Sequence, residues 1–140
     1  MSPARWLIDK SALHRLSHAE VARAVQPHVA AGVVGVSIVT ELEMGYSARS
    51  AADYRRVRAD LVDHLLAVAI PLHAEQRARE VQLRLVERGQ HRSAGVADLL
   101  LAATAELEGL TVLHYDADFE VIAEVTDQPT EWVVPRGSVP

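Results

Sequence analysis

Short apolar runs alternate along the chain with longer stretches that have a helical period. The first run, Leu7-Ile8, stops at Asp9, and a β-branched run at residues 32–39 follows a predicted helix at 18–31. Short continuous apolar runs are typical of strands that are covered on both faces, as strands are in parallel sheets. Because strands and helices alternate, the pattern predicts an α/β fold with right-handed crossover connections.

The other elements are predicted from the same alternation. The helix at 18–31 is expected to be interrupted near Pro27, and Thr40 is expected to open the next helix through a capping box with Glu43. The helix at 96–108 is apolar on most sides and should lie at the centre of the molecule. Further helices are expected at 11–16, 51–66, 74–88 and 116–124, and further strands at 67–70, 110–113 and 132–134.

The composition is that of one globular domain. The chain has 140 residues, enough to bury a core, and it has no cysteine, which excludes disulfides and thiolate metal sites. No apolar run reaches the roughly 18 residues of a membrane span, and the N-terminus lacks the apolar core of a signal peptide. We therefore expect a soluble, cytoplasmic protein. Residues 135–140 are either a native tail or the remnant of a protease site, and no part in the fold is assigned to them.

Charge is unevenly distributed along the chain. The net charge of −5 argues against a protein that coats nucleic acid electrostatically. Residues 49–92 hold nine Arg against six acids, whereas residues 93–135 hold nine acids and neither Arg nor Lys. An enzyme with an acidic pocket and a basic approach would show this distribution, and so would an ordinary surface.

Four acids, Asp9, Glu43, Asp98 and Asp116, stand where a predicted strand ends or a predicted helix begins. Any one of them could simply cap its helix. Parallel strands, however, bring their carboxyl ends to one edge, so the four acids should share a crevice. Like charges about 4 Å apart repel by roughly 4 kcal/mol at an effective dielectric near 20, so such a cluster needs protons or a cation. All-oxygen ligands favour Mg²⁺ or Mn²⁺ over Zn²⁺, and Asp118 is a candidate fifth ligand.

The residues around these acids resemble the acidic motifs of PIN-domain ribonucleases, and most closely those of the VapC-type toxins of type II toxin–antitoxin systems. The resemblance implies a PIN domain at residues 1–134, with a central parallel sheet of about five strands flanked by helices in three layers. It rests on four stretches that occur in the right order: Leu7-Ile8-Asp9-Lys10-Ser11-Ala12-Leu13, Thr40-Glu41-Leu42-Glu43-Met44-Gly45, Ala97-Asp98-Leu99-Leu100-Leu101-Ala102-Ala103-Thr104-Ala105 and Asp116-Ala117-Asp118-Phe119.

The resemblance also implies a function. Asp9, Glu43, Asp98 and Asp116 match the catalytic, metal-binding acids of the family, with Asp118 in support. The chain would then be an endoribonuclease toxin that hydrolyses RNA phosphodiester bonds with acid-bound Mg²⁺ or Mn²⁺. The implied partners are a second copy of the chain and a cognate VapB-type antitoxin, whose tail would enter the acidic crevice and block it.

The chain departs from the family pattern at Lys10 and His114, where the family often has Thr. Lys10 either contacts a phosphate, neutralises the acids or points to solvent, and His114 either lines the pocket or is structural. Lys10 and Arg92 are interpreted as phosphate contacts. Ser11 matches a small hydroxyl that the family often places beside the first acid, and it is a candidate for substrate binding.

The alternative function is a non-catalytic PIN-like module that binds RNA or protein, and the presence of all four acids argues against it. A phospho-receiver domain also gathers acids at strand ends, but it needs a lysine after its last strand, and the single lysine of this chain is Lys10. Zinc catalysis is disfavoured, because His14 and His18 have helical spacing but no third ligand pattern follows.

Overall fold

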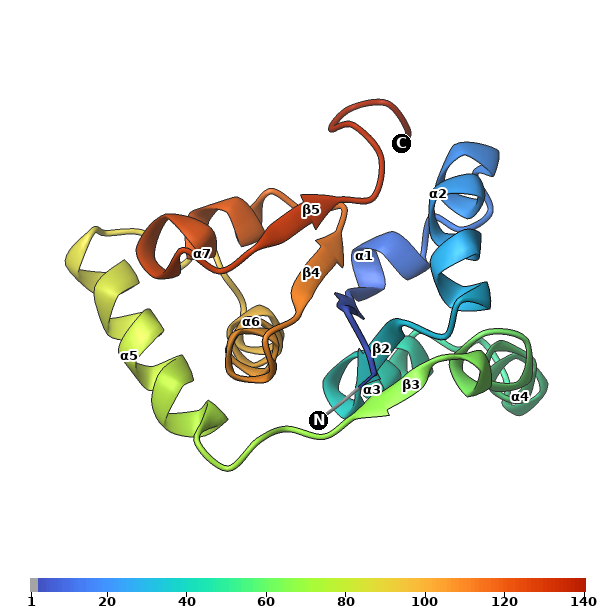
Figure 1. Ribbon diagram of the computed structural model, residues 1–140, viewed down its shortest axis with the longest axis horizontal. Coiled ribbons are helices and arrows are strands. Elements are labelled where there is room, and N and C mark those ends of the chain that lie inside the picture. Colours follow the sequence, from blue (N-terminus) through green and yellow to red (C-terminus); the bar gives the residue numbers. More distant parts are fainter. Residues whose placement is uncertain (1–2) are drawn as a thin grey trace.

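The computed structural model describes residues 3–140 and contains one five-stranded, wholly parallel sheet with helices on both faces (Figure 1). The predicted α/β class and its five-stranded sheet are confirmed. The strand order is β3-β2-β1-β4-β5. The chain therefore adds β2 and β3 on one side of β1 and then adds β4 and β5 on the other side. The strands are β1 (Trp6–Ile8), β2 (Val34–Ser37), β3 (Leu66–Val68), β4 (Thr111–His114) and β5 (Thr130–Trp132).

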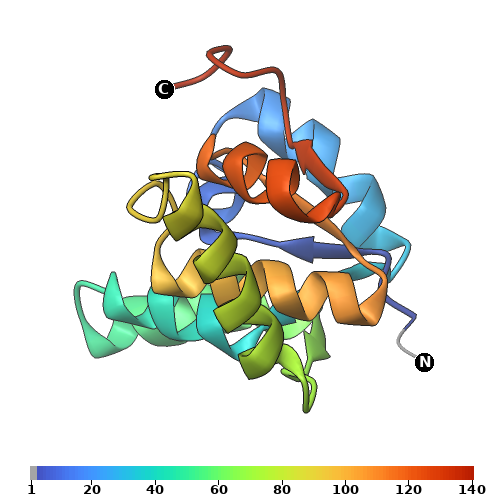
Figure 2. The same ribbon diagram turned by 90° about the vertical axis from the view of Figure 1, so that its left-hand side faces the viewer.

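The helices form the two outer layers. In the view of Figure 1, α5, α6 and α7 lie to one side of the sheet and α1, α2 and α4 to the other, and Figure 2 shows the molecule turned by 90°. The bounds are α1 (Lys10–Leu13), α2 (Ala19–Ala30), α3 (Ile38–Tyr46), α4 (Ala51–Asp60), the 3-10 turn η1 (Val62–His64), α5 (Ala74–Glu87), α6 (Val96–Glu108) and α7 (Asp118–Thr126).

Two apolar clusters, one on each face of the sheet, make up the core. Neighbouring strand residues point to opposite faces, so Leu7 packs in the cluster with α5, α6 and α7, while Ile8 packs with α1 and α2. Both side chains are fully buried. The helix α6 carries six buried residues, which agrees with the central place predicted for it. Within residues 3–140, no helix is both long and apolar enough to span a bilayer.

The junction of β2 and α3 differs from the prediction. The strand stops at Ser37, whose hydroxyl accepts a hydrogen bond from the amide of Val39 at 3.2 Å, and α3 begins at Ile38. The capping box proposed for Thr40 and Glu43 is therefore wrong, because Thr40 lies inside the helix and is completely buried. As a result, Glu43 projects from the middle of α3 and does not cap its start.

Other predicted boundaries are shifted by a few residues. Pro27 lies inside α2 and does not interrupt it, since a single missing amide near the end leaves the later bond from Ala31 to the Pro27 carbonyl intact. The helix predicted at 51–66 ends at Asp60, and β3 and β5 begin earlier than expected. After β5 the apolar residues Val133 and Val134 stay buried beyond the paired residues, whereas Ala69 and Ile70 after β3 are exposed. An apolar run therefore does not by itself mark which residues pair in the sheet.

The segment after β5 packs back onto the domain. Val133, Val134 and Val139 are buried in the same cluster as Ile8, and the Tyr115 hydroxyl donates to the carbonyl of Val139 at 2.7 Å. Residues 135–140 therefore belong to the folded structure, although the sequence pattern assigned them no part in it. Figure 1 shows this segment leaving β5 and turning back on itself.

Candidate metal centre

The strand order places a topological switch point between β1 and β4, the position where ligands bind in open parallel sheets. Asp9 follows β1 and Asp116 follows β4. One oxygen of each carboxylate caps the next turn: Asp9 accepts from the amide of Ser11 at 3.0 Å, and Asp116 from the amide of Asp118 at 2.9 Å. Because a carboxylate has two oxygens and several lone pairs, capping leaves each acid with capacity for a second partner.

A third acid reaches this edge from the first turn of α6. Asp98 accepts a hydrogen bond from the amide of Gly95 at 3.3 Å, so it too caps its helix. Asp98, Asp116 and Asp118 each offer one oxygen such that all three atoms lie within 4.8 Å of one another. Oxygens bound to a common ion at about 2.0–2.6 Å are at most about 5 Å apart, so the three-acid cluster fits a hard divalent cation.

Burial makes this cluster unfavourable for negative charge. The pKa of Asp98 is raised to about 7, mainly by burial and next by the charge of Asp9, with smaller effects from Asp116 and Asp118. Burial also raises the pKa of Asp9, against the lowering effect of its hydrogen bonds to Ser11, and it raises that of Asp118. The group therefore favours a bound proton or cation.

Glu43 lies at the edge of this group and is paired with Lys10. The Lys10 ammonium lies 2.8 Å from a Glu43 carboxylate oxygen, and this hydrogen bond raises the pKa of Lys10, as do the charges of Asp9 and Asp98. The Glu43 charge in turn raises the pKa of Asp9. This ion pair agrees with neutralisation of the acids by Lys10, and the phosphate contact of Lys10 stays a prediction. Glu43 is near the site but is not a member of the three-acid cluster.

Ser11 and His114 form hydrogen bonds to the backbone of the segment that carries Asp116. Ser11 is 8% exposed, and its hydroxyl accepts from the amide of Tyr115 at 2.8 Å, which connects α1 to the loop after β4. His114 is completely buried beside Phe119, and its Nδ1 accepts from the amide of Asp116 at 3.1 Å. Burial lowers the pKa of His114 to about 4, so the ring is neutral and structural and does not line the pocket.

Arg92 lies on the exposed turn that leads into α6. It forms no ion pair within residues 3–140, which leaves its guanidinium available to an external anion. The residue that the sequence pattern did not single out is Tyr115, which lies between His114 and Asp116. Its place directly before an acidic motif was the only available sign, because the atoms that it contacts are far away in the sequence.

Comparison with known proteins identifies the family. The family model for the PIN domain matches residues 6–125. The chain belongs to the PIN-domain family. Its curated relatives include Ribonuclease VapC51 of Mycobacterium tuberculosis, which is 44% identical over 96% of this chain and 97% of the relative. Ribonuclease VapC2 of the same organism is 44% identical over 97% of each chain.

Solved structures of VapBC complexes contain chains with the same fold. The DNA-bound VapBC of Salmonella typhimurium matches with a TM-score of 0.77 at 18% identity, covering 94% of this chain and 99% of the other. VapBC2 of Rickettsia felis, bound to a promoter DNA fragment, matches with a TM-score of 0.76 at 14% identity over 91% and 98% of the two chains. Identities this low support the fold alone, and the fold agrees with the family membership.

Two ion pairs between helices account for part of the charge pattern of this PIN domain. Arg77 of α5 pairs with Glu106 of α6, and Arg88, directly after α5, lies 3.0 Å from Glu124 of α7. These pairs join the arginine-rich stretch 49–92 to the acidic stretch that follows it. These two pairs therefore connect α5 to α6 and to α7, and they account for part of the uneven charge.

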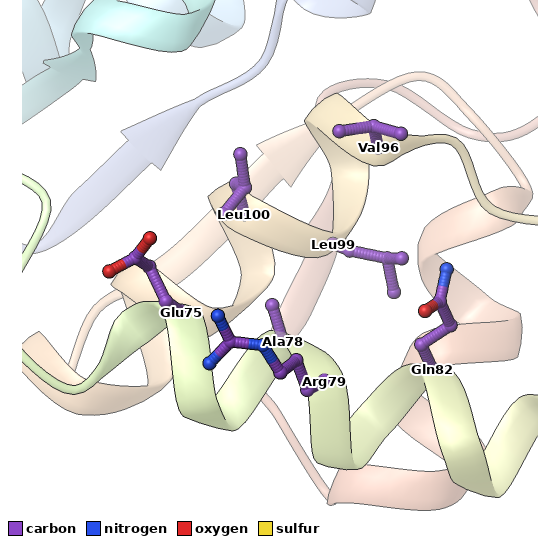
Figure 3. A pocket seen from close by; sticks show the side chains of 7 residues that line it. All are labelled: Glu75, Ala78, Arg79, Gln82, Val96, Leu99 and Leu100. Atoms are coloured by element: carbon purple, nitrogen blue, oxygen red, sulfur yellow. The ribbon is translucent and has the colours of Figure 1, made fainter.

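A separate cavity of about 230 Å³ lies between α5 and α6 (Figure 3). Its wall is mostly apolar, and none of the five candidate acids contributes to it. It is lined by Glu75, Ala78, Arg79, Gln82, Val96, Leu99 and Leu100. Asp98 is on the same helix but does not line this cavity, so the metal centre and the cavity are distinct features of α6.

Proposed function

We propose that this PIN-domain chain is a metal-dependent endoribonuclease and the toxin of a cytoplasmic toxin–antitoxin pair. The observation that carries the proposal is the three-acid cluster Asp98, Asp116 and Asp118, whose oxygens lie within 4.8 Å at the switch point of the sheet. Relatives named as VapC ribonucleases are 44% identical to this chain over nearly its full length, which supports RNA as the substrate.

The cluster would hold Mg²⁺ or Mn²⁺, because its donors are all oxygens and none of its three carboxylates forms an ion pair within residues 3–140. When bound, such an ion polarises a phosphoryl oxygen and lowers the pKa of a coordinated water. Asp9, directly after β1, is proposed as a further acid of the site, and its nearly full burial keeps its carboxylate in a fixed place. Glu43 of α3 is proposed to act at the edge of the site through its ion pair with Lys10.

Two cationic residues are proposed to bind the RNA backbone. The Lys10 side chain is 42% exposed while it pairs with Glu43, and its ammonium has three donors, so a phosphate is proposed as its second partner. Arg92 stands on the exposed turn before α6, and its planar guanidinium suits a bidentate phosphate contact. Ser11 is proposed to support the site through its bond to Tyr115, because its hydroxyl already has that partner.

The proposed partners follow from the same acidic site. Structural neighbours of this chain include VapBC complexes, and a cognate VapB-type antitoxin is proposed to inhibit it. Inhibition is expected through a basic residue placed among the acids, because a guanidinium pairs with a carboxylate bidentately and competes with the metal. A homodimer is proposed as the form that binds the antitoxin.

The direct test is cleavage of RNA by the purified chain, free of antitoxin, in Mn²⁺, in Mg²⁺ and in chelator. We expect cleavage only with metal, and we expect Asp98→Asn to lower the rate at least a hundredfold, since a lost ligand typically costs several kcal/mol of barrier. Asp53→Asn is the matched control, because Asp53 also lies in the first turn of a helix and accepts a main-chain hydrogen bond, from Arg49 at 3.0 Å.

Either of two results would contradict the proposal. If Asp98→Asn cuts RNA at the parental rate, Asp98 is a helix cap and not a ligand. If the parent chain binds RNA but does not cut it with either metal, the chain is a binding module of the PIN fold.

A further inference from the structure

Tyr115 connects residues 137–139 to the loop that carries Asp116. Its hydroxyl donates to the carbonyl of Val139 at 2.7 Å and accepts from the amides of Gly137 at 2.9 Å and Val139 at 3.2 Å. Its own amide donates to the Ser11 hydroxyl at 2.8 Å. Tyr115 directly precedes Asp116, so the same residue contacts both the C-terminal segment and the base of the metal centre.

Arg15 strengthens this connection from the chain just after α1. Its guanidinium carbon lies 4.6 Å from the centre of the Tyr115 ring, in a cation–π arrangement. Its Nε donates to a main-chain oxygen of Pro140 at 3.0 Å, and its Nη1 donates to the carbonyl of Ser11 at 2.8 Å. One side chain thus contacts the segment, the tyrosine and the turn that follows Asp9.

Apolar packing holds the same segment in place. Val133, Val134 and Val139 are 7%, 8% and 9% exposed, and they belong to the cluster that contains Ile8 and Leu13 on either side of Asp9. The match to the PIN family model ends at residue 125, so this segment lies beyond the part of the chain that the model describes.

We propose that residues 133–140 form a clasp that positions the acidic loop 115–118, which runs from the end of β4 to the first residue of α7, with Tyr115 and Arg15 as positioning residues. The loop carries Asp116 and Asp118, whose charges repel Asp98 across the centre. This repulsion favours movement of the loop away from α6, which would separate the three oxygens. The bond from the Asp116 amide to His114 opposes that movement, and the clasp supplies a further fixed point at the start of the loop.

The inference rests on the proposed function, because the loop needs a precise position only if it holds a metal. The test is Tyr115→Phe, which keeps the ring beneath Arg15 but removes the hydroxyl and its three hydrogen bonds. The melting temperature is measured in chelator and across a Mn²⁺ titration, together with kcat for RNA cleavage at each Mn²⁺ concentration. Tyr46→Phe is the matched control, since Tyr46 is 93% exposed on α3.

We expect Tyr115→Phe to raise the Mn²⁺ concentration for half-maximal stabilisation by roughly tenfold, the size usual for groups that orient metal ligands. Cleavage should recover toward the parental kcat at saturating Mn²⁺, and Tyr46→Phe should match the parent. Arg15→Gln, which loses the ring contact and the bond to Pro140, should shift the titration in the same direction, and it serves as the test if Tyr115→Phe does not fold.

The outcomes separate the two proposals. A parent chain that Mn²⁺ does not stabilise contradicts the proposed function itself. A parent that responds to Mn²⁺, beside a Tyr115→Phe variant that melts earlier in chelator but has the parental half-saturation, shows that the clasp only stabilises the fold and overturns this inference.

Discussion

At the scale of single residues, capping and metal binding are compatible roles for the acids of this site. Asp9, Asp98 and Asp116 each accept a main-chain hydrogen bond near the start of a helical turn. The carboxylates of Asp98 and Asp116 nevertheless also lie within reach of a common ion. A helix start supplies amide donors that fix the carboxylate, and a fixed carboxylate makes a better ligand.

The raised pKa of Asp98 has a testable consequence for stability. With a folded-state pKa of about 7 against an ordinary value of 3.8, the folded protein binds the Asp98 proton more tightly than the unfolded chain does. Its contribution to stability is therefore complete below about pH 4 and is lost as the pH rises through about 7. In chelator at pH 8, we expect Asp98→Asn to melt at the parental temperature or higher, by about 3 °C for each kcal/mol of relieved repulsion. Thermal melts from pH 4 to 8 measure this.

The buried His114 changes the pH dependence of stability in the direction opposite to Asp98. Its pKa is lowered from 6.5 to about 4, so its contribution to stability is complete above about pH 6.5 and is lost as the pH falls toward 4. In the parent, the two effects partly cancel between these values. Asp98→Asn should therefore show a steeper rise in stability from pH 4 to 6.5 than the parent, and an unchanged profile would mean that Asp98 titrates normally.

At the scale of elements, the tight packing of β2 decides the geometry of the sheet beside the site. Gly35 lies in the middle of this strand, paired with Leu7 of β1 and Leu66 of β3. A Cβ atom there would lie 2.5 Å from the Val68 Cγ2 atom and 3.2 Å from the Trp6 carbonyl oxygen. Even the methyl group of alanine would therefore force the Val68 side chain or the neighbouring backbone to move.

We expect Gly35→Ala to destabilise the fold by about 1–3 kcal/mol, the usual cost of overpacking a core. Denaturant unfolding measures the change, and the double variant Gly35→Ala with Val68→Ala is the control. Removing the Val68 methyl groups opens the space that the new Cβ needs, so the double variant should lose less than the sum of the two single losses. Strictly additive losses would show that the close contact is not the cause.

At the scale of the whole molecule, the strand order concentrates uncompensated negative charge at one edge of the sheet. The chain reverses its direction of growth between β1 and β4, and the acids after these strands meet the first turn of α6 at that point. The unfolded chain disperses the same acids. A cation that binds the folded cluster must therefore stabilise the fold by mass action.

We expect millimolar Mn²⁺ to raise the melting temperature of the parent chain, with Mg²⁺ and Ca²⁺ acting more weakly. At a concentration about a hundred times the dissociation constant, the gain is about 2.7 kcal/mol. Differential scanning fluorimetry measures it, and Asp98→Asn should lose most of the response while Asp53→Asn keeps it. Equal responses from all three chains would place the bound ion outside the three-acid cluster.

The amino-acid sequence by itself determined the fold class, the number of strands and the place of Asp9, Asp98 and Asp116 at strand ends and helix starts, but not the place of Glu43, which lies in the middle of α3. These features follow from local periodicity, because an apolar run of strand length or a helical stripe already encodes which face a segment buries. The sequence was less informative where two local signals competed. The cap of α3 was assigned to Thr40 when Ser37 provides it, since both residues suit a helix start and only packing shows where β2 stops.

Only the tertiary structure decided which acids form the cluster and what supports them. In the sequence, Glu43 and Asp98 both belong to acidic motifs at predicted helix starts. In the structure, Glu43 is paired with Lys10 and lies outside the three-acid cluster, while Asp118 belongs to it. The clasp joins Arg15 to Pro140, residues at opposite ends of the sequence. No local pattern records such contacts, because they depend on how the strand order brings β4 and the segment after β5 beside α1, and on the side chains that meet there.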